Sequence, residues 1–220
     1  IVERCTTPYI IDNLPCYPPI GDHQAALLGC GLGPNELSIN ISTGSQVSAI
    51  RSSFEPGEFH TRPYIGSQYL TTYPDIPAGR SLQVLLGLVT ELHSKNNDPW
   101  ACIQQAVENT PHTDLEIDLS FFRSNKHSTG NITNIHEDNF TLGHLFRSAF
   151  QSMAECYHRQ AQQLPGANSF ERLVLSGGIA QKQPLLRELI AERFDLPYRL
   201  CEHREDTLLG LITLANSLVE

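Results

Sequence analysis

An aspartate opens the first apolar helical segment of the sequence. Asp22 stands in the run Pro19-Ile-Gly-Asp-His-Gln-Ala-Ala-Leu-Leu-Gly29, directly after a glycine. A carboxylate held at a helix start can accept the proton of a substrate hydroxyl group and so act as a general base. Considered alone, an aspartate in this place is more often a helix N-cap that accepts backbone N–H groups. Asp22 is therefore a candidate base whose alternative role is capping.

Two glycine turns later in the chain have the composition of phosphate-binding loops. The first lies in Asn40-Ile-Ser-Thr-Gly-Ser45 and the second in Leu173-Val-Leu-Ser-Gly-Gly-Ile-Ala180. Backbone amides exposed in such turns bind anions, and glycine lets a flat ligand lie against the main chain. Considered alone, each turn also fits a structural role, the first as a hairpin turn and the second as a helix entry. Neither contains a full G-x-G-x-x-G motif.

Strand-like and helix-like patterns around these residues predict the elements that must position them. Alternating apolar residues predict strands at 36–42 and 46–51 and, as an antiparallel meander, at 62–65 and 69–73. A short buried strand at 171–178 runs into the second glycine turn, and another strand is expected at 198–201. Apolar residues at helical spacing predict helices at 22–30, 81–93, 100–107, 141–164, 181–194 and 205–218.

This order of elements indicates an α/β or α+β sheet with helices packed on it. Residues 1–20 contain four prolines and little periodicity, and they are interpreted as an extended lead-in. Residues 21–220 form one domain in this interpretation, and the polar segment 123–138 is expected to be a loop. Gly210 in the last helix is expected to let another backbone approach closely, because it has no side chain.

Composition limits the classes of partner. With 24 acidic and 15 basic residues the formal charge is -9, which disfavours nucleic acid or an anionic membrane surface as the main partner. No stretch approaches the roughly 20 apolar residues of a membrane helix, and a cytoplasmic location is expected. Six cysteines and nine histidines are scattered without close ligand spacing. Neither a disulfide framework nor a protein-built metal site is therefore expected.

The order of these motifs resembles the second domain of the FGGY family of sugar kinases. An acid at a helix start, a Thr-Gly turn, a strand-Gly-Gly-helix unit, and a last helix with Glu205 and Gly210 follow one another between about 19 and 218. The resemblance implies a ribonuclease H-like α/β domain, as in actin-like ATPases, with a mixed sheet flanked by helices. It also implies a sugar substrate, ATP, and Mg²⁺ held mainly by ATP and by an N-terminal kinase domain of the same protein.

The resemblance assigns roles at the first glycine turn and at the helix before it. Asp22 matches the family's catalytic base, which accepts the proton of the attacking sugar hydroxyl. Gly21 and Gln24 are expected to bind the sugar together with Asp22. Thr43 and Gly44 match a phosphate loop that holds the outer phosphates of ATP through a hydroxyl group and backbone amides.

The second glycine turn matches the family's adenosine motif. Gly177, Gly178 and Ile179 are expected to lie against the nucleotide, and Gln181 is expected to hydrogen-bond adenine or ribose. Many members have Gly-Gly-Gly where this chain has Ser176-Gly-Gly, and Gly-Thr-Ser-Gly where it has Ser42-Thr-Gly-Ser. Both differences keep small residues, so nucleotide binding remains the expectation.

Four segments are most similar to members that phosphorylate sedoheptulose: Asn40–Ser45, Gly130-Asn-Ile-Thr-Asn-Ile135, Phe140-Thr-Leu-Gly-His144 and Ser176-Gly-Gly178. Phosphoryl transfer from ATP to sedoheptulose, giving the 7-phosphate, is the expected reaction. Xylulose, ribulose or glycerol as acceptor is the enzymatic alternative, and a non-catalytic nucleotide-binding module is the alternative of another class. Because kinases of this family close two domains around their substrates, this chain alone is expected to be folded and inactive.

Overall fold

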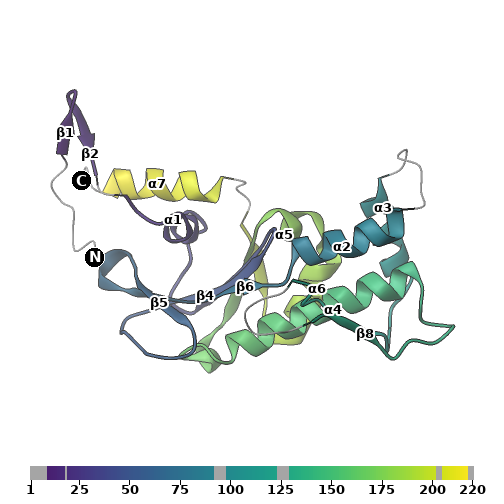
Figure 1. The fold of residues 1–220 in the computed structure, drawn as a ribbon. Helices are drawn as coiled ribbons and strands as arrows, with labels where there is room; N and C mark the ends of the chain where they lie inside the picture. Colours follow the sequence, from purple (N-terminus) through teal and green to yellow (C-terminus); the bar gives the residue numbers. More distant parts are fainter. Residues whose placement is uncertain (1–8, 18, 92–97, 123–128, 202–204, 218–220) are drawn as a thin grey trace.

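A six-stranded mixed sheet forms the centre of the computed structural model, which describes residues 9–17, 19–91, 98–122, 129–201 and 205–217 (Figure 1). Three neighbouring strands are parallel, and the other three continue the sheet as an antiparallel meander. The strand order is β10 (Tyr198–Leu200), β9 (Arg172–Ser176), β3 (Glu36–Ile41), β4 (Ser45–Arg51), β6 (Tyr69–Ile76) and β5 (His60–Pro63). The mixed sheet and the meander predicted from the sequence are confirmed.

Helices cover both faces of this sheet. Along β9, Leu173 and Leu175 belong to one hydrophobic cluster and Val174 to another, because successive side chains of a strand point to opposite faces. Burial on both faces explains why this strand is apolar throughout. The larger cluster includes side chains from α2 (Gly79–Thr90), α3 (Pro99–Glu108), α4 (Leu142–Ala161) and α6 (Pro184–Phe194), and the smaller one includes Leu27 of α1 (Asp22–Gly29).

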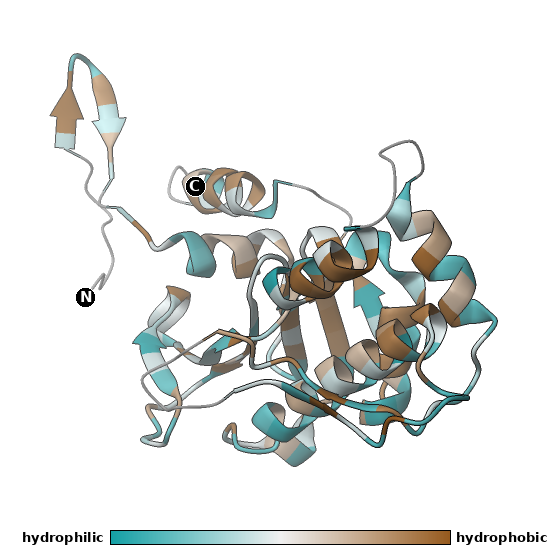
Figure 2. Ribbon diagram, turned by 45° about the vertical axis from the view of Figure 1, so that its right-hand side comes forward, coloured by the Kyte–Doolittle hydropathy of each residue, from teal (hydrophilic) through white to brown (hydrophobic). Residues whose placement is uncertain are grey.

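The first and last helices of the domain pack against each other through glycines. α1 and α7 (Asp206–Ser217) lie side by side on one face of the sheet (Figures 1 and 2). A Cβ atom added to Gly210 would clash with the carbonyl oxygen of Ala25, and one added to Gly29 would clash with that of Asp206. The close backbone approach expected at Gly210 is therefore confirmed.

We expect Gly210→Ala to destabilise the protein by about 1–3 kcal/mol, because its methyl group must push α7 away from α1. Gly87→Ala is the matched control. Gly87 also lies within a helix, but an added Cβ there has no atom within 4 Å, so the change should stabilise the protein by about 0.4–1 kcal/mol. Urea denaturation of both variants measures these effects. Equal changes in unfolding free energy would contradict the close packing.

The described part of the N-terminal segment is a hairpin and not an extended lead-in. β1 (Tyr9–Ile11) pairs with β2 (Leu14–Cys16), and the hairpin stands away from the sheet (Figures 1 and 2). Asp12 and Asn13 form its two-residue turn with φ of 50° and 65°. Two positive φ values are what the tightest hairpin turns require, and Asp and Asn tolerate them best after glycine.

Two further predictions of elements are wrong in detail. The helix expected at 181–194 is divided into α5 (Gly178–Lys182) and α6, because Pro184 forces Gln183 out of the helical conformation, to φ -118° and ψ 83°. The polar loop at 123–138 contains a strand, β8 (Asn131–Thr133), which pairs with β7 (Glu116–Asp118); residues 123–128 lie outside the described part.

Two 3-10 turns, η1 (Ile65–Ser67) and η2 (Ala167–Ser169), complete the elements of the described segments. Within those segments, no helix has both the length and the apolar character needed to cross a membrane.

Candidate functional site

The two glycine turns meet at one edge of the sheet. β3 and β9 run parallel with Asn40 opposite Ser176, so the turn after each strand begins at the same edge. A Cβ atom added to Gly177 would clash with the carbonyl oxygen of Ile41, which shows how closely the second turn approaches the end of β3. The structure therefore brings together two motifs that are far apart in the sequence.

Asn40 links the two turns by hydrogen bonds. Its Nδ2 donates to Ser176 Oγ at 3.0 Å, and its Oδ1 accepts from Ser42 Oγ at 3.2 Å. The Ser42 hydroxyl also lies 3.2 Å from the carbonyl oxygen of Gly44. Serine replaces the family's glycine at Ser42, Ser45 and Ser176, and the structure joins two of these, Ser42 and Ser176, through the side chain of Asn40.

The first glycine turn is hydrogen-bonded to the start of α2 and is otherwise exposed. The backbone N–H groups of Gly79 and Arg80, at the start of α2, donate to the carbonyl oxygens of Ser42 at 3.0 Å and Thr43 at 2.9 Å. Thr43 and Gly44 are exposed, and a Cβ atom added to Gly44 has no atom within 4 Å. The turn thus presents a hydroxyl group and backbone to a ligand from a fixed position.

A buried hydrogen bond anchors the end of this turn to α4. The hydroxyl groups of Ser45 and Tyr157 lie 2.7 Å apart, and both residues are buried. Burial raises the pKa of Tyr157, so the phenol is neutral at physiological pH. Sequence reasoning did not select Tyr157, because nothing local relates a tyrosine on α4 to a turn in the meander.

The second glycine turn leads into α5. Gly177 has φ of 93°, whereas Gly178 is exposed and has open space where a side chain would start. Ile179 is half-buried against Gly79, at the start of α2. The half-buried Gln181 donates its backbone N–H to the Gly177 carbonyl at 3.1 Å. Ile179 therefore connects the second turn with the start of α2, which holds the first turn.

Asp22 is the first residue of α1 and not its N-cap. The N-cap position belongs to Gly21, which has no side chain to bond the helix. Asp22 is exposed, and its Oδ1 accepts the backbone N–H of His23 at 2.8 Å. The side chain of Gln24 folds back over Gly21, so a Cβ atom there would clash with the Gln24 amide. The capping alternative for Asp22 is therefore wrong, since a cap bonds the amides two or three residues on.

A polar cavity of about 350 Å³ connects Asp22 with the ends of the parallel strands. Asp22, Asn40 and Ser176 all line it, so the candidate base faces the edge at which the two turns begin. Sequence reasoning missed most of the lining residues, because the wall is built from six separated segments of the chain. The other polar side chains in the wall are His23, Gln46, Arg62, Thr72, Asp206 and Thr207.

His23 is neutral beside the candidate base. Its Nε2 lies 3.2 Å from Ser48 Oγ, which in turn lies 2.8 Å from Thr72 Oγ1. Burial, and secondarily the charge of Arg62, lower the pKa of His23 from the usual 6.5 to about 4, although the nearby Asp22 acts in the opposite direction. The imidazole is therefore uncharged at physiological pH, and His23 adds no charge next to Asp22 at the start of α1.

This lowered pKa predicts a loss of stability in acid. Between pH 6.5 and pH 4 the unfolded chain binds a proton at His23 and the folded chain does not, so stability falls as the pH falls. Above pH 6.5 the contribution is complete. We expect the loss due to His23 to reach at most about 3 kcal/mol, and His23→Gln to remove it. Urea denaturation at pH 7 and pH 4.5 measures the difference; parallel losses in both proteins would refute it.

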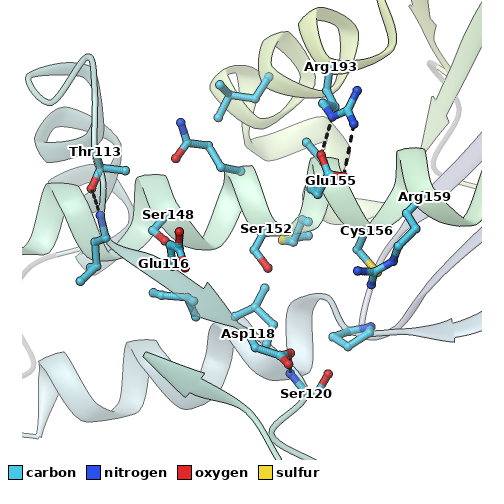
Figure 3. Close-up of a pocket in the computed structure, with 18 of the residues that line it drawn as sticks. Thr113, Glu116, Asp118, Ser120, Ser148, Ser152, Glu155, Cys156, Arg159 and Arg193 are labelled. Carbon is cyan, nitrogen blue, oxygen red and sulfur yellow. Dashed lines mark hydrogen bonds and ion pairs between the residues drawn. The ribbon is translucent and has the colours of Figure 1, made fainter. Parts of the chain in front are cut away.

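A larger hollow of about 940 Å³ lies elsewhere, between β7, α4 and α6 (Figure 3). Its wall includes Glu116, Asp118 and Ser152, together with an exposed ion pair between Arg193 and Glu155 (Nη2–Oε1 3.2 Å). None of the residues expected to bind sugar or nucleotide lines this hollow. We therefore place the candidate site in the smaller cavity, where the candidate base and the strand ends converge.

Comparisons with known proteins agree with the fold. Residues 81–218 match the model of the FGGY family of carbohydrate kinases, C-terminal domain. The matched segment includes the second glycine turn, and it begins after Asp22 and Thr43. Human sedoheptulokinase is 23% identical over 196 residues, which cover 81% of this chain and 41% of that protein.

Solved sugar kinases share the architecture at low sequence identity. Xylulose kinase from Rhodospirillum rubrum superposes with a TM-score of 0.78 at 16% identity, over 90% of this chain and 41% of that one. Glycerol kinase from Plasmodium falciparum, solved with ADP, gives 0.75 at 18% identity, over 94% and 43%. The chain thus spans about two fifths of the length of these relatives. The predicted fold class, a ribonuclease H-like domain with a mixed sheet flanked by helices, is confirmed.

Proposed function

Because the chain belongs to the FGGY family of carbohydrate kinases and carries its C-terminal domain, we propose that the protein transfers the terminal phosphoryl group of ATP to a ketose hydroxyl. Sedoheptulose is the acceptor we propose, with its 7-phosphate as product. One observation carries the proposal: Asp22 shares a single cavity with Asn40 and Ser176, at the edge where both glycine turns begin. A base and a nucleotide site must meet in this way for transfer between two bound substrates.

In this proposal Asp22 orients the sugar hydroxyl group and accepts its proton while the oxygen attacks phosphorus. Positioning is the larger part of catalysis in phosphoryl transfer, and the start of α1 supplies it for the exposed carboxylate. The neutral His23 beside it adds no positive charge that would compete for the carboxylate. Gln24, whose amide covers Gly21, is the proposed sugar contact next to Asp22.

The nucleotide is proposed to lie across the two turns. Thr43 and Gly44 hold the outer phosphates, and Gly177, Gly178 and Ile179, with Gln181 at the next turn of helix, face the adenosine. The exposed backbone at Gly44 and Gly178 supports this placement, since neither position has an atom where a side chain would begin. Asn40 keeps the two turns at a constant separation through its bonds to Ser42 and Ser176.

Mg²⁺ bound with ATP would neutralise charge on the transferred group. Oxygen donors line the cavity, among them Asp22, Asn40 and Thr72, and oxygen is the ligand type that Mg²⁺ prefers. We propose that ATP and the N-terminal kinase domain of the same protein supply most of the ligands. That domain would also supply much of the sugar pocket, which is why this chain alone is proposed to be inactive.

The choice of sugar rests on the four segments that resemble sedoheptulose-phosphorylating members and on the similarity to human sedoheptulokinase. Xylulose and glycerol kinases are the competing alternatives, because solved members of both kinds share the fold, with TM-scores of 0.78 and 0.75. The test is a comparison of kcat/KM for sedoheptulose, xylulose, ribulose and glycerol in a protein that joins this chain to its N-terminal kinase domain, with ADP release and product mass as readouts. Sedoheptulose should give the highest value. Preference for a pentulose or glycerol would overturn the acceptor, and ATP binding without transfer to any of the four would indicate a non-catalytic module.

A further inference from the structure

Two cysteines that are 171 positions apart in the sequence meet beside the cavity. Cys30 is the C-cap of α1, and Cys201 directly follows β10. Their sulfur atoms lie 2.9 Å apart, and the residues are 5% and 3% exposed. Their sequence spacing resembles no metal motif, so only the fold brings the two thiols together.

A carboxylate completes the group. Asp206, the first residue of α7, accepts the backbone N–H of Thr207 on Oδ1 at 2.8 Å, which fixes the orientation of its side chain. Its Oδ2 lies 3.7 Å from Cys30 Sγ. One donor atom from each of Cys30, Cys201 and Asp206 lies within 4.8 Å of the other two.

We propose that Cys30, Cys201 and Asp206 bind one Zn²⁺ ion. Two thiolates and a carboxylate are ligands that zinc takes in proteins, and three protein ligands leave a fourth tetrahedral position for solvent or another ligand. On binding, two Zn–S bonds and one Zn–O bond form, and the two thiol protons leave to water. This inference does not rest on the proposed kinase activity.

The geometry requires one small adjustment. With Zn–S bonds of about 2.3 Å, tetrahedral sulfurs lie about 3.8 Å apart, so the pair must separate by about 0.9 Å, within reach of a side-chain rotation. A sulfur and a carboxylate oxygen on the same zinc lie about 3.5 Å apart, close to the 3.7 Å between Cys30 and Asp206. The carboxylate is thus already near its place.

The surroundings suit a metal that is held by sulfur. Leu27, Leu32, Ile50, Leu70 and Val174 form the apolar cluster around the thiols, which excludes water from the Zn–S side. Arg199 donates from Nη1 to the Cys30 carbonyl at 2.8 Å and so fixes the backbone of one ligand. Cys30 and Asp206 line the polar cavity, and Cys201 is buried beside Cys30.

It follows that the fourth position of the zinc opens toward the cavity that Asp22 also lines. The ion would tie the end of α1 to the start of α7, next to the close contact between the two helices at Gly29 and Gly210. It would therefore stabilise the helix that carries Asp22, independently of any substrate.

The experiment is a titration of the reduced protein with Co²⁺, a spectroscopic substitute for zinc, in a phosphine reductant that does not bind metal. We expect one equivalent to produce the thiolate charge-transfer and tetrahedral visible bands, and Zn²⁺ to remove them by displacement. Cys30→Ser and Cys201→Ser should each weaken binding about 100-fold or more, whereas Cys102→Ser, which changes an exposed cysteine, should have no effect.

A fourth variant controls for loss of metal binding that is caused by unfolding. Asp206→Asn keeps the acceptor for Thr207 and nearly the same shape, so it should retain the fold while it weakens Co²⁺ binding and shifts the visible bands. Thermal unfolding with and without Zn²⁺ should show a rise in Tm in the wild type and in Cys102→Ser, but not in Cys30→Ser.

Three results would overturn the proposal. The first is no visible band in the reduced, folded protein at a tenfold excess of Co²⁺. The second is the same spectrum and affinity in Cys30→Ser or Cys201→Ser as in the wild type. The third is a Cys30–Cys201 disulfide in the isolated protein whose reduction gives no metal binding, which would identify the pair as a redox couple instead.

Discussion

Replacing Asp22 with asparagine is expected to lower kcat for sugar phosphorylation by about 10²- to 10⁴-fold, the usual contribution of a positioned general base. The amide has nearly the same shape as the carboxylate and keeps the acceptor for the His23 N–H group, so α1 should start at the same residue. The amide cannot accept the hydroxyl proton. KM for ATP should stay within about twofold, because the proposed nucleotide contacts lie at the two glycine turns.

The matched control is Asp75→Asn. Asp75 is an exposed aspartate on β6 with φ of 61°, a conformation that asparagine tolerates, and it does not line the cavity. Steady-state kinetics of both variants, in the protein joined to its N-terminal kinase domain, should show normal turnover for Asp75→Asn alone. Normal turnover in Asp22→Asn would refute the base. A parallel loss of ATP binding would show that Asp22 holds the nucleotide instead.

Local sequence patterns were sufficient to predict most of the elements around this site. The apolar residues after Asp22 and the alternation before Ser42 correspond to α1 and β3. In β3 the apolar Leu37, Ile39 and Ile41 all belong to one hydrophobic cluster, which leaves a period of two in the sequence. Two of the failures were also local. Pro184 ends a helix by a rule that needs no tertiary contact, and Asp12 and Asn13 are residue types that tolerate the positive φ of a tight hairpin turn.

The cavity itself could not be predicted in this way. Asn40 and Ser176 are 136 positions apart, and their hydrogen bond depends on the parallel pairing of β3 with β9. Cys30 and Cys201 meet for a similar reason, since α1 and the end of β10 lie on the same part of the sheet. Parallel partner strands are not joined by a tight turn, so no short segment of the sequence determines their register.

The second glycine turn gives the other large effect. Gly177→Ala is expected to destabilise the protein by about 2–5 kcal/mol, for two reasons that add. Its φ of 93° with ψ of 158° is a backbone conformation that residues other than glycine scarcely adopt. In addition, the new methyl group would clash with the carbonyl oxygen of Ile41, which belongs to a central strand and cannot move freely.

Gly178→Ala tests the nucleotide site without disturbing the fold. Gly178 is the first residue of α5 and faces open space. Alanine there should leave the unfolding free energy unchanged or raise it by up to about 1 kcal/mol. Its methyl group would, however, occupy the surface proposed for adenosine, so ATP affinity should fall about tenfold or more. Urea denaturation and calorimetric ATP titration of both variants distinguish the two roles. If Gly178→Ala kept both its stability and its ATP affinity, the second turn would be a helix entry that binds no nucleotide. The proposed position of ATP would then be wrong, whereas the role of Asp22 as the base would still be tested separately by Asp22→Asn.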